Sequence, residues 1–299
     1  MLQRDGFIEE IKNAIKKGDN IYFLSADFGA AALDELREEL PNNFIHCGIS
    51  EQNMIDVAIG LALEGKKVFC YAMAPFISLR AVEQIKQIGI MNLPICLISV
   101  GVGIGYADSG PTHYVTEEFA CMRSIVGCNV YTAADTLTAR NLALSLLANP
   151  KFSYVRLDRH ALPDLSMDFT KDEFAQLGNT NSDKIALVSH GKMTHECIKA
   201  FESNQGKYVV FDIIQSKPFP KDVVNELKKC KGAVVVDEQT PAGSLGAAVF
   251  EACSEENFWP KIVNVTLPEM YFFENGGREY LHRKHGLSFE NIMVQSNRI

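Results

Sequence analysis

The chain has 299 residues, of which 47% are hydrophobic and 22% are charged, and its formal net charge is −8. That length suffices for two domains of ordinary size, and the composition is that of a folded soluble protein. Nucleic acids and anionic membranes attract basic surfaces, so an acidic chain with dispersed lysines and arginines argues against both as main partners. The sequence shows no secretory leader and no apolar run long enough to span a bilayer, which predicts a cytoplasmic protein.

Short apolar runs alternate with longer amphipathic segments along the first half of the chain. This alternation indicates βα units on a parallel sheet. The strands expected there are 21–26, 68–71, 95–100, 129–132 and 153–157, and the expected helices are 6–16, 51–64, 78–91, 116–124 and 136–148.

A polar stretch without a clear period follows, and the same rhythm then restarts. We therefore expect a first domain at 1–165, a linker at 166–183 and a second domain at 184–299. Strands are expected there at 185–189, 208–213, 233–237 and 262–266, and helices at 194–202, 221–229 and 244–252. The predicted fold class is α/β, with two domains that each contain a mostly parallel sheet flanked by helices.

Eight cysteines occur without a Cys-x-x-Cys pair and without a histidine at metal-ligand spacing nearby. Most lie in apolar, strand-like runs, where a free thiol behaves as a small hydrophobic group. We expect reduced structural cysteines and no metal site built by this chain.

The segment GISEQNM, residues 48–54, places a carboxylate beside the apolar stretch 54–63. Ser50 is a suitable N-cap for a helix that reads as central, and Glu51 then lies in its first turn, where the helix dipole favours an acid. Glu51 is either a capping acid or a ligand-binding group, because parallel sheets bind ligands at strand ends and the adjoining helix starts.

Three segments carry a resemblance to a known family: HCGISEQNMIDVAIGLALEG, APFISLRAVEQI and GYADSGPTHYVTEEFACMRSI. Together they resemble the pyrimidine-binding domain of transketolases and 1-deoxyxylulose-5-phosphate synthases. In the second half, VVFDIIQSKPFP, VVVDEQTPAGSLGAAVFE and YLHRKHGLSFENI are similar to the C-terminal domain of the same enzymes. The likeness covers essentially the whole chain, and the combination of motifs is far more specific than any one of them.

The resemblance implies that Glu51 hydrogen-bonds the N1′ atom of the aminopyrimidine of thiamine diphosphate, and so activates the cofactor. Phe76 matches the aromatic residue that stacks on that ring, with a core phenylalanine as the alternative. Asp27 matches an acid at the cofactor and subunit interface, with a turn-forming aspartate as the alternative.

The same resemblance assigns substrate contacts. His113, in GPTHY, matches a histidine that contacts the donor's oxygens and assists proton transfer. Asp108 lies close to the position of an acid that precedes this motif. Arg159 and Arg4 match arginines that hold the phosphate of a sugar, with salt bridges as the alternative. The glycine-rich VGVGIG, residues 100–105, is interpreted as an active-site loop.

The chain lacks the Gly-Asp-Gly motif that holds the diphosphate and the divalent cation in this superfamily. The resemblance therefore implies a split transketolase, in which the diphosphate and most of the Mg²⁺ or Ca²⁺ coordination fall to a separate N-terminal subunit. We expect a heterotetramer of two such chains and two partners, with self-association and stability supplied by the C-terminal domain.

The function expected is the transfer of a two-carbon ketol unit between sugar phosphates, by a transketolase-type transferase subunit that is active only with its partner. The alternatives are a subunit like 1-deoxyxylulose-5-phosphate synthase or the β subunit of a 2-oxoacid dehydrogenase, and a non-catalytic homologue.

Overall fold

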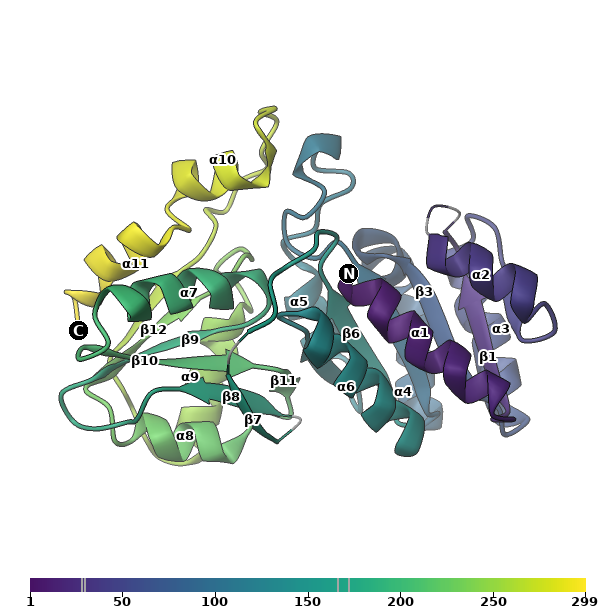
Figure 1. The fold of residues 1–299 in the computed structure, drawn as a ribbon, viewed down its shortest axis with the longest axis horizontal. Coiled ribbons are helices and arrows are strands. Elements are labelled where there is room, and N and C mark those ends of the chain that lie inside the picture. The colour runs from purple at the N-terminus through teal and green to yellow at the C-terminus, as the bar shows by residue number, and fades with distance from the viewer. Residues whose placement is uncertain (28, 30, 166, 172) are drawn as a thin grey trace. The chain divides into compact units, whose positions relative to one another are not determined.

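The computed structural model describes residues 1–27, 29, 31–165, 167–171 and 173–299 (Figure 1). They form two compact units. The first comprises Met1–Val102 and Cys121–Asp164, and the second comprises Gly103–Ala120 and Leu165–Ile299. The segment 103–120, which carries the GPTH motif, thus belongs to the second unit although it lies in the first half of the sequence.

The first unit is built on a parallel sheet with strand order β5-β6-β4-β3-β1-β2. Its strands are β1 (Ile21–Ser25), β2 (Phe44–His46), β3 (Lys67–Met73), β4 (Ile95–Val100), β5 (Asn129–Thr132) and β6 (Ser153–Leu157). Every residue of β4 and β6 is buried, as expected for strands that are covered on both faces.

Helices cover both faces of this sheet. The helices are α1 (Gln3–Lys16), α2 (Ala31–Glu39), α3 (Glu51–Leu63), α4 (Val82–Met91), α6 (Thr136–Ala148) and α5 (Glu118–Ser124), the last of which contains the boundary between the two units. Figure 1 shows α1 and α6 packed together on one face, and α3 and α4 on the other. A π-helical turn, η1 (Phe76–Arg80), precedes α4.

The second unit contains a mixed sheet with strand order β13-β12-β9-β10-β8-β7, in which β8 and β7 run antiparallel to their neighbours. The strands of this sheet are β7 (Asp168–Lys171), β8 (Phe174–Leu177), β9 (Ile185–Ser189), β10 (Tyr208–Ile213), β12 (Gly232–Val236) and β13 (Ile262–Val265). The unit also contains the short strand β11 (Gln215–Lys217), which is not part of this sheet. Its helices are η2 (Ala107–Ser109), a 3-10 turn, and α7 (Lys192–Ser203), α8 (Lys221–Leu227), α9 (Leu245–Glu255), α10 (Gly277–His285) and α11 (Phe289–Ser296).

The predicted fold class is confirmed, and every predicted strand and helix is present. The sequence analysis missed β2, β7, β8, β11, α2, α10 and α11. β7 and β8 lie within the range 166–183 that was expected to be a linker, so the domain boundaries stay a prediction. All eight cysteines are free.

Of the expectations about α3, the N-cap position of Ser50 is confirmed, whereas its capping hydrogen bond and the central place of the helix are wrong. Ser50 is the N-cap residue, but its side chain makes no capping hydrogen bond. The helix is not central either: it buries Met54, Ile55 and Ala58 and leaves Leu63 63% exposed. Ile59 and Ala62 continue this buried face, whereas the opposite side of the helix is exposed, so α3 is an amphipathic helix with one buried face.

Candidate functional site

Three of the expected site residues follow the carboxyl ends of strands in the first unit. Asp27 comes after β1, Phe76 after β3 and Arg159 after β6. Because all six strands of this unit are parallel, these ends lie at one edge of the sheet, where α/β folds bind ligands. The first unit therefore presents one edge that carries an acid, an aromatic ring and a guanidinium group.

Glu51 is buried at the start of α3, with 1% of its surface exposed. Its Oε2 atom accepts a hydrogen bond from Nη1 of Arg80 at 2.8 Å. A buried carboxylate is costly unless it is paired, and Arg80 supplies the opposite charge. The Arg80 side chain is itself 44% exposed, so this pair lies at the margin between the interior and solvent.

Phe76 joins the same cluster through Arg80. The guanidinium carbon of Arg80 lies 4.3 Å from the centroid of the Phe76 ring, which is the geometry of a cation–π contact. Both residues belong to the π-helical turn η1, and turns of this kind are frequent at functional sites. The sequence analysis did not identify Arg80. The only signal in the sequence was its position as a basic residue four places after Phe76.

A buried glutamine joins the chain segments that carry Arg4 and Arg159. Gln3 is fully buried, its Nε2 donates to the carbonyl oxygen of Ala133 at 3.1 Å, and its Oε1 accepts from the backbone N–H of Asp158 at 2.8 Å. These bonds hold the start of α1 against the loops that follow β5 and β6. Arg4 and Arg159 are the next residues along each chain segment.

Arg4 also lies in an acidic setting. Its Nε donates to Oδ1 of Asp5 at 3.1 Å. Burial by itself lowers the pKa of this guanidinium, but Tyr71 and Asp5 outweigh burial and raise the pKa above its ordinary value. Arg4 therefore stays charged, and its partner Asp5 accounts for the salt-bridge alternative at this residue.

Asp27 forms a local turn. Its Oδ1 accepts from the backbone N–H of Gly29 at 3.1 Å, and its carbonyl oxygen accepts from Oγ of Ser25 at 2.9 Å. This geometry supports the turn-forming interpretation of Asp27. It leaves the side chain half-buried at the sheet edge.

Asp108 and His113 belong to the second unit, on the segment 103–120. Asp108 is exposed on η2, and its Oδ1 lies 3.6 Å from the point that a Cβ on Gly277 would occupy, at the start of α10. His113 is half-buried, with its Nδ1 2.9 Å from Oγ1 of Thr112. The structure thus groups the seven expected residues by unit: Glu51, Phe76, Asp27, Arg4 and Arg159 in the first, and Asp108 and His113 in the second.

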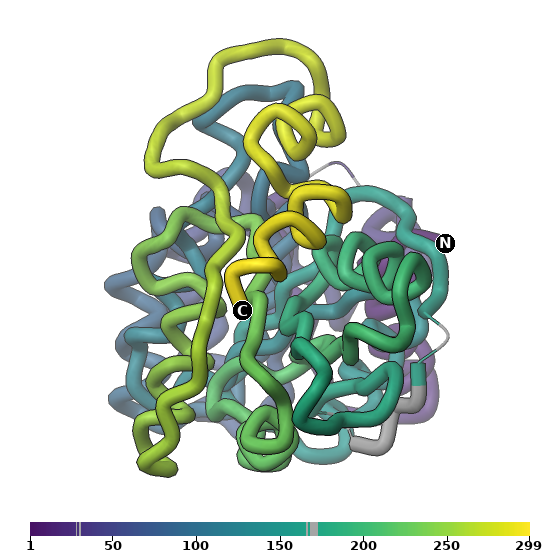
Figure 2. Tube along the Cα trace, turned by 90° about the vertical axis from the view of Figure 1, so that its left-hand side faces the viewer, coloured from purple at the N-terminus to yellow at the C-terminus, as the bar shows by residue number. Residues whose placement is uncertain are grey.

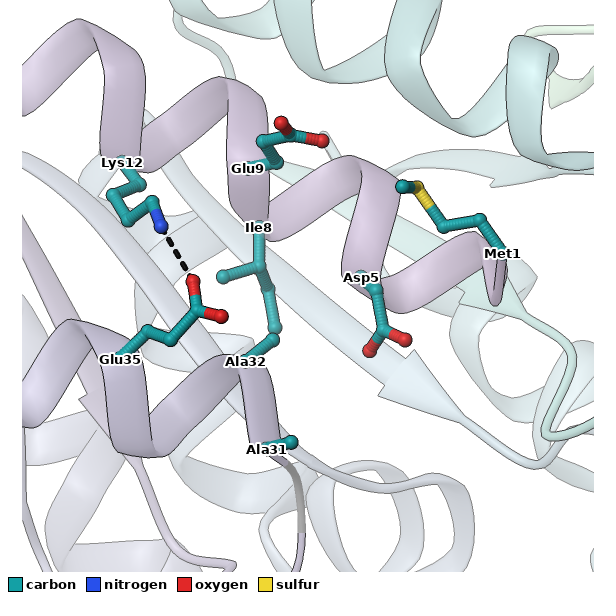
Figure 3. Close-up of a pocket in the computed structure, with 8 residues that line it drawn as sticks. All are labelled: Met1, Asp5, Ile8, Glu9, Lys12, Ala31, Ala32 and Glu35. Carbon is teal, nitrogen blue, oxygen red and sulfur yellow. Dashed lines mark hydrogen bonds and ion pairs between the residues drawn. The ribbon is translucent and has the colours of Figure 1, made fainter.

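A separate pocket of about 240 Å³ lies between α1 and α2 (Figure 3). Asp5, Glu9 and Glu35 line it, and Lys12 binds Glu35 across it. Three acids against one lysine disfavour a phosphate group, which needs cationic partners.

Within the described part of the chain, no group of three or more His, Cys, Asp or Glu side chains is placed to hold a metal ion. None of the described helices is long and apolar enough to cross a membrane.

Comparison with known families agrees with this architecture. Residues 2–164 match the family model described as transketolase, pyrimidine binding domain, and residues 177–292 match transketolase, C-terminal domain. The first match alone covers more than half of the chain, which therefore belongs to the transketolase family. It corresponds to the C-terminal half of a transketolase, of the kind found as a separate subunit, and is thus a subunit of a transketolase-type transferase.

Two relatives of similar length are themselves subunits. The chain is 27% identical to one of the subunits of the apulose-4-phosphate transketolase of Phocaeicola vulgatus, over 97% of this chain and 94% of that protein. It is 30% identical to the 6-deoxy-6-sulfo-D-fructose transketolase subunit SqwH of a Clostridium species, over 99% and 94% of the two chains. By contrast, it spans 48% of transketolase-like protein 1 of Bos taurus, with 30% identity over 94% of this chain.

Solved structures show the same fold. A structure titled "Split gene transketolase, inactive beta4 tetramer" superposes with a TM-score of 0.84 at 23% identity, over all of this chain and 97% of the other. A transketolase from Pichia stipitis superposes with a TM-score of 0.82 at 16% identity, and 45% of that chain is covered.

Proposed function

We propose that this chain is the C-terminal subunit of a thiamine diphosphate-dependent split transketolase, which transfers a two-carbon ketol unit between sugar phosphates together with a diphosphate-binding partner. The observation that carries the proposal is the buried carboxylate of Glu51, joined through Arg80 to the Phe76 ring at the carboxyl edge of a parallel sheet. A buried acid beside an aromatic ring fits a flat, nitrogen-containing heterocycle.

The residues of this chain fit the pyrimidine half of the cofactor. The hydrogen bond from Arg80 reaches Oε2 of Glu51, so the second carboxylate oxygen is the one assigned to the N1′ atom of the ring. Phe76, which Arg80 contacts through its guanidinium group, would stack on the aminopyrimidine. When bound, thiamine diphosphate supplies the carbon nucleophile of the reaction. Glu51 holds the shared proton at N1′, and exclusion of water strengthens that hydrogen bond.

Substrate binding is assigned to two groups of residues. Arg4 and Arg159, which the Gln3 bonds bring to one edge, bind the phosphate of the sugar through paired guanidinium donors. Asp108 and His113 bind and orient the donor's oxygens. Both relatives of similar length are named for anionic sugars or sugar phosphates, which supports a cationic substrate pocket.

A partner subunit completes the enzyme in this proposal. The chain has no Gly-Asp-Gly motif, so the diphosphate and its Mg²⁺ are assigned mainly to that partner. The relatives of matching length are subunits, which supports a complex of two such chains with two partners.

The test mixes the purified chain with its partner, thiamine diphosphate and Mg²⁺, and measures ketol transfer from sugar phosphates. We expect transfer only with both subunits, and a loss of about a hundredfold or more in kcat for Glu51→Gln, since the carboxyl group is needed for proton sharing. Asp56→Asn is the matched control, because Asp56 is an exposed acid on the same helix. Turnover of pyruvate without any sugar donor would contradict the proposal, as would full activity of Glu51→Gln.

A further inference from the structure

The segment 103–120 occupies the place where the second unit's sheet would be expected to bind a ligand. From β9 the chain proceeds to β10 on one side, and β12 lies on the other side of β9. Such a reversal of strand order opens a crevice at the carboxyl ends of the two central strands, and α/β sheets bind their ligands there. In this protein, residues that follow β9 and β12 contact the segment 103–120 instead.

Three contacts define this packing. The backbone N–H of Thr240 donates to the carbonyl oxygen of Thr116 at 3.0 Å, and Nε2 of Gln239 donates to the carbonyl oxygen of Val115 at 3.4 Å. His190, the residue after β9, meets the Phe119 ring edge-on with the centroids 5.1 Å apart. The segment 103–120 therefore packs at the strand ends where a sheet of this class binds a ligand.

A buried charge cluster stands at the start of the segment. Glu238, two residues after β12, pairs with Arg278 and His282, and all three side chains are at most 7% exposed. Nε of Arg278 donates to Oε1 of Glu238 at 2.6 Å. The carboxylate also presses against Gly103: a Cβ built on Gly103 would lie 2.1 Å from Oε2 of Glu238. With φ of +59°, Gly103 has a backbone conformation that other residues adopt rarely.

The cluster reaches the expected substrate residues along two routes. Arg278 and His282 belong to α10, which packs against η2, and the first residue of α10, Gly277, lies beside Asp108. Gly103 begins the segment and pairs with Val115, two residues after His113, in an isolated β-bridge. Figure 2 shows the yellow helix α10 beside the blue loop that contains η2. Glu238 thus fixes both the helix that supports Asp108 and the base of the loop that carries His113.

We infer that Glu238, together with Arg278 and His282, positions the segment 103–120, so that the second unit sets the affinity of the enzyme for its donor sugar. The inference rests on the proposed function, because it assigns donor binding to Asp108 and His113. The inference gives the second unit a role in substrate binding besides the subunit contacts expected of it. Glu238 is a positioning residue, since it acts through the loop and does not touch the donor.

The test uses the complex of this chain with its partner and two variants that disturb the contact from opposite sides. Glu238→Gln keeps the shape but leaves Arg278 without its counter-charge, and Gly103→Ala forces a methyl group into the carboxylate while the charges stay. In both variants we expect the KM for the sugar phosphate donor to rise roughly tenfold to a hundredfold, because small displacements of positioning groups have effects of that size. The KM for thiamine diphosphate stays within about twofold, since Glu51 and Phe76 belong to the first unit.

Glu279→Gln is the matched control. Glu279 is on the same helix and pairs with Lys192 at 3.1 Å, but its side chain is 60% exposed. The Glu279→Gln variant should have the same KM for the sugar phosphate donor as the wild type. Thermal unfolding identifies a temperature at which all variants are folded, and Gly103→Ala decides the question if Glu238→Gln does not fold.

A second readout does not depend on activity. Amide hydrogen exchange in the chain should accelerate in residues 103–117 of both variants and remain unchanged in the Glu279 variant. An unchanged donor KM, an equal rise in the two KM values, or unchanged exchange in this loop would each overturn the inference. A wild-type complex that transfers no ketol unit would instead contradict the proposed function, and the hydrogen exchange would still test the packing.

Discussion

At the scale of single residues, Arg80 links the two side chains of the proposed cofactor site. It binds one oxygen of the buried Glu51 and covers the Phe76 ring. One side chain therefore restrains both groups that the proposed function assigns to the aminopyrimidine. An unpaired carboxylate at that depth would turn toward solvent or take up a proton, and either change would remove it from a fixed orientation. Arg80 thus holds Glu51 in a fixed orientation before the cofactor arrives.

Replacing Arg80 by methionine tests this role. The methionine keeps length and apolar contact but removes the hydrogen bond and the charge. We expect the affinity of the assembled complex for thiamine diphosphate, measured by calorimetry, to fall about tenfold, which corresponds to roughly the net worth of one charge-assisted hydrogen bond. The affinity of Arg80→Lys for thiamine diphosphate should lie between those of the wild type and Arg80→Met, because an ammonium group keeps the charge but not the planar stacking. A methionine variant that binds the cofactor more tightly would show that Arg80 competes for the site.

Gln3 supports a second residue-scale prediction. Gln3→Leu removes both hydrogen bonds that hold the start of α1 to the loops after β5 and β6. We expect the KM for phosphorylated donors to rise about tenfold while that for thiamine diphosphate is unchanged, because Arg4 and Arg159 lose their common anchor. Gln52→Leu, an exposed position on α3, is the control. Equal donor kinetics in the Gln3 and Gln52 variants would contradict a phosphate site at this edge.

At the scale of elements, the sequence predicted those whose periodicity is strong. The uninterrupted apolar runs of β4 and β9 and the amphipathic α7 lie where their patterns placed them. Elements that depend on tertiary contacts were missed. The polar strand β7 gains its hydrogen bonds from β8, and α10 is a charged helix whose burial depends on Glu238.

The same limit applies to the candidate site. Motif resemblance selected Glu51, Phe76 and His113, since these residues carry the family's spacing, and their roles stay predictions. The Arg80 pair and the attachment of the segment 103–120 to the second unit depend on contacts between residues far apart in the chain. Such contacts leave no local pattern in a single sequence.

The N-cap of α6 gives an element-scale prediction. Asp135 is fully buried, and its Oδ1 accepts the backbone N–H of Thr138 at 2.7 Å. Asp135→Ala should lower the free energy of unfolding by about 1–2 kcal/mol, because a first-turn donor loses its partner. Asp135→Asn keeps an acceptor at the same place and should recover most of that loss. Urea unfolding followed by circular dichroism provides the measurement, and equal stabilities of the two variants would contradict a capping role.

At the scale of the whole molecule, the buried charge cluster makes stability depend on acidity. Burial alone would raise the pKa of Glu238, but Arg278 and His282 outweigh it and hold the pKa at about 2, below the ordinary value of 4.5. The folded state therefore binds the proton of this carboxyl more weakly than the unfolded state. The resulting contribution, about 3 kcal/mol, is fully present above pH 4.5 and is lost as the pH falls toward 2.

Urea unfolding at a series of pH values tests this contribution directly. Trp259 is the only tryptophan in the sequence and lies in the second unit, so its fluorescence reports on the unit that contains the cluster. We expect wild type to exceed Glu238→Gln in stability by the largest margin above pH 4.5, and the margin to shrink steadily toward pH 2, because the wild-type carboxyl then takes up the proton that glutamine never needs. Glu279→Gln should track the wild type far more closely, since its side chain is 60% exposed. A margin between wild type and Glu238→Gln that stays constant from pH 6 to pH 2 would show that Arg278 and His282 do not hold Glu238 ionised, and that shape alone, without charge, secures α10 and the loop beside it.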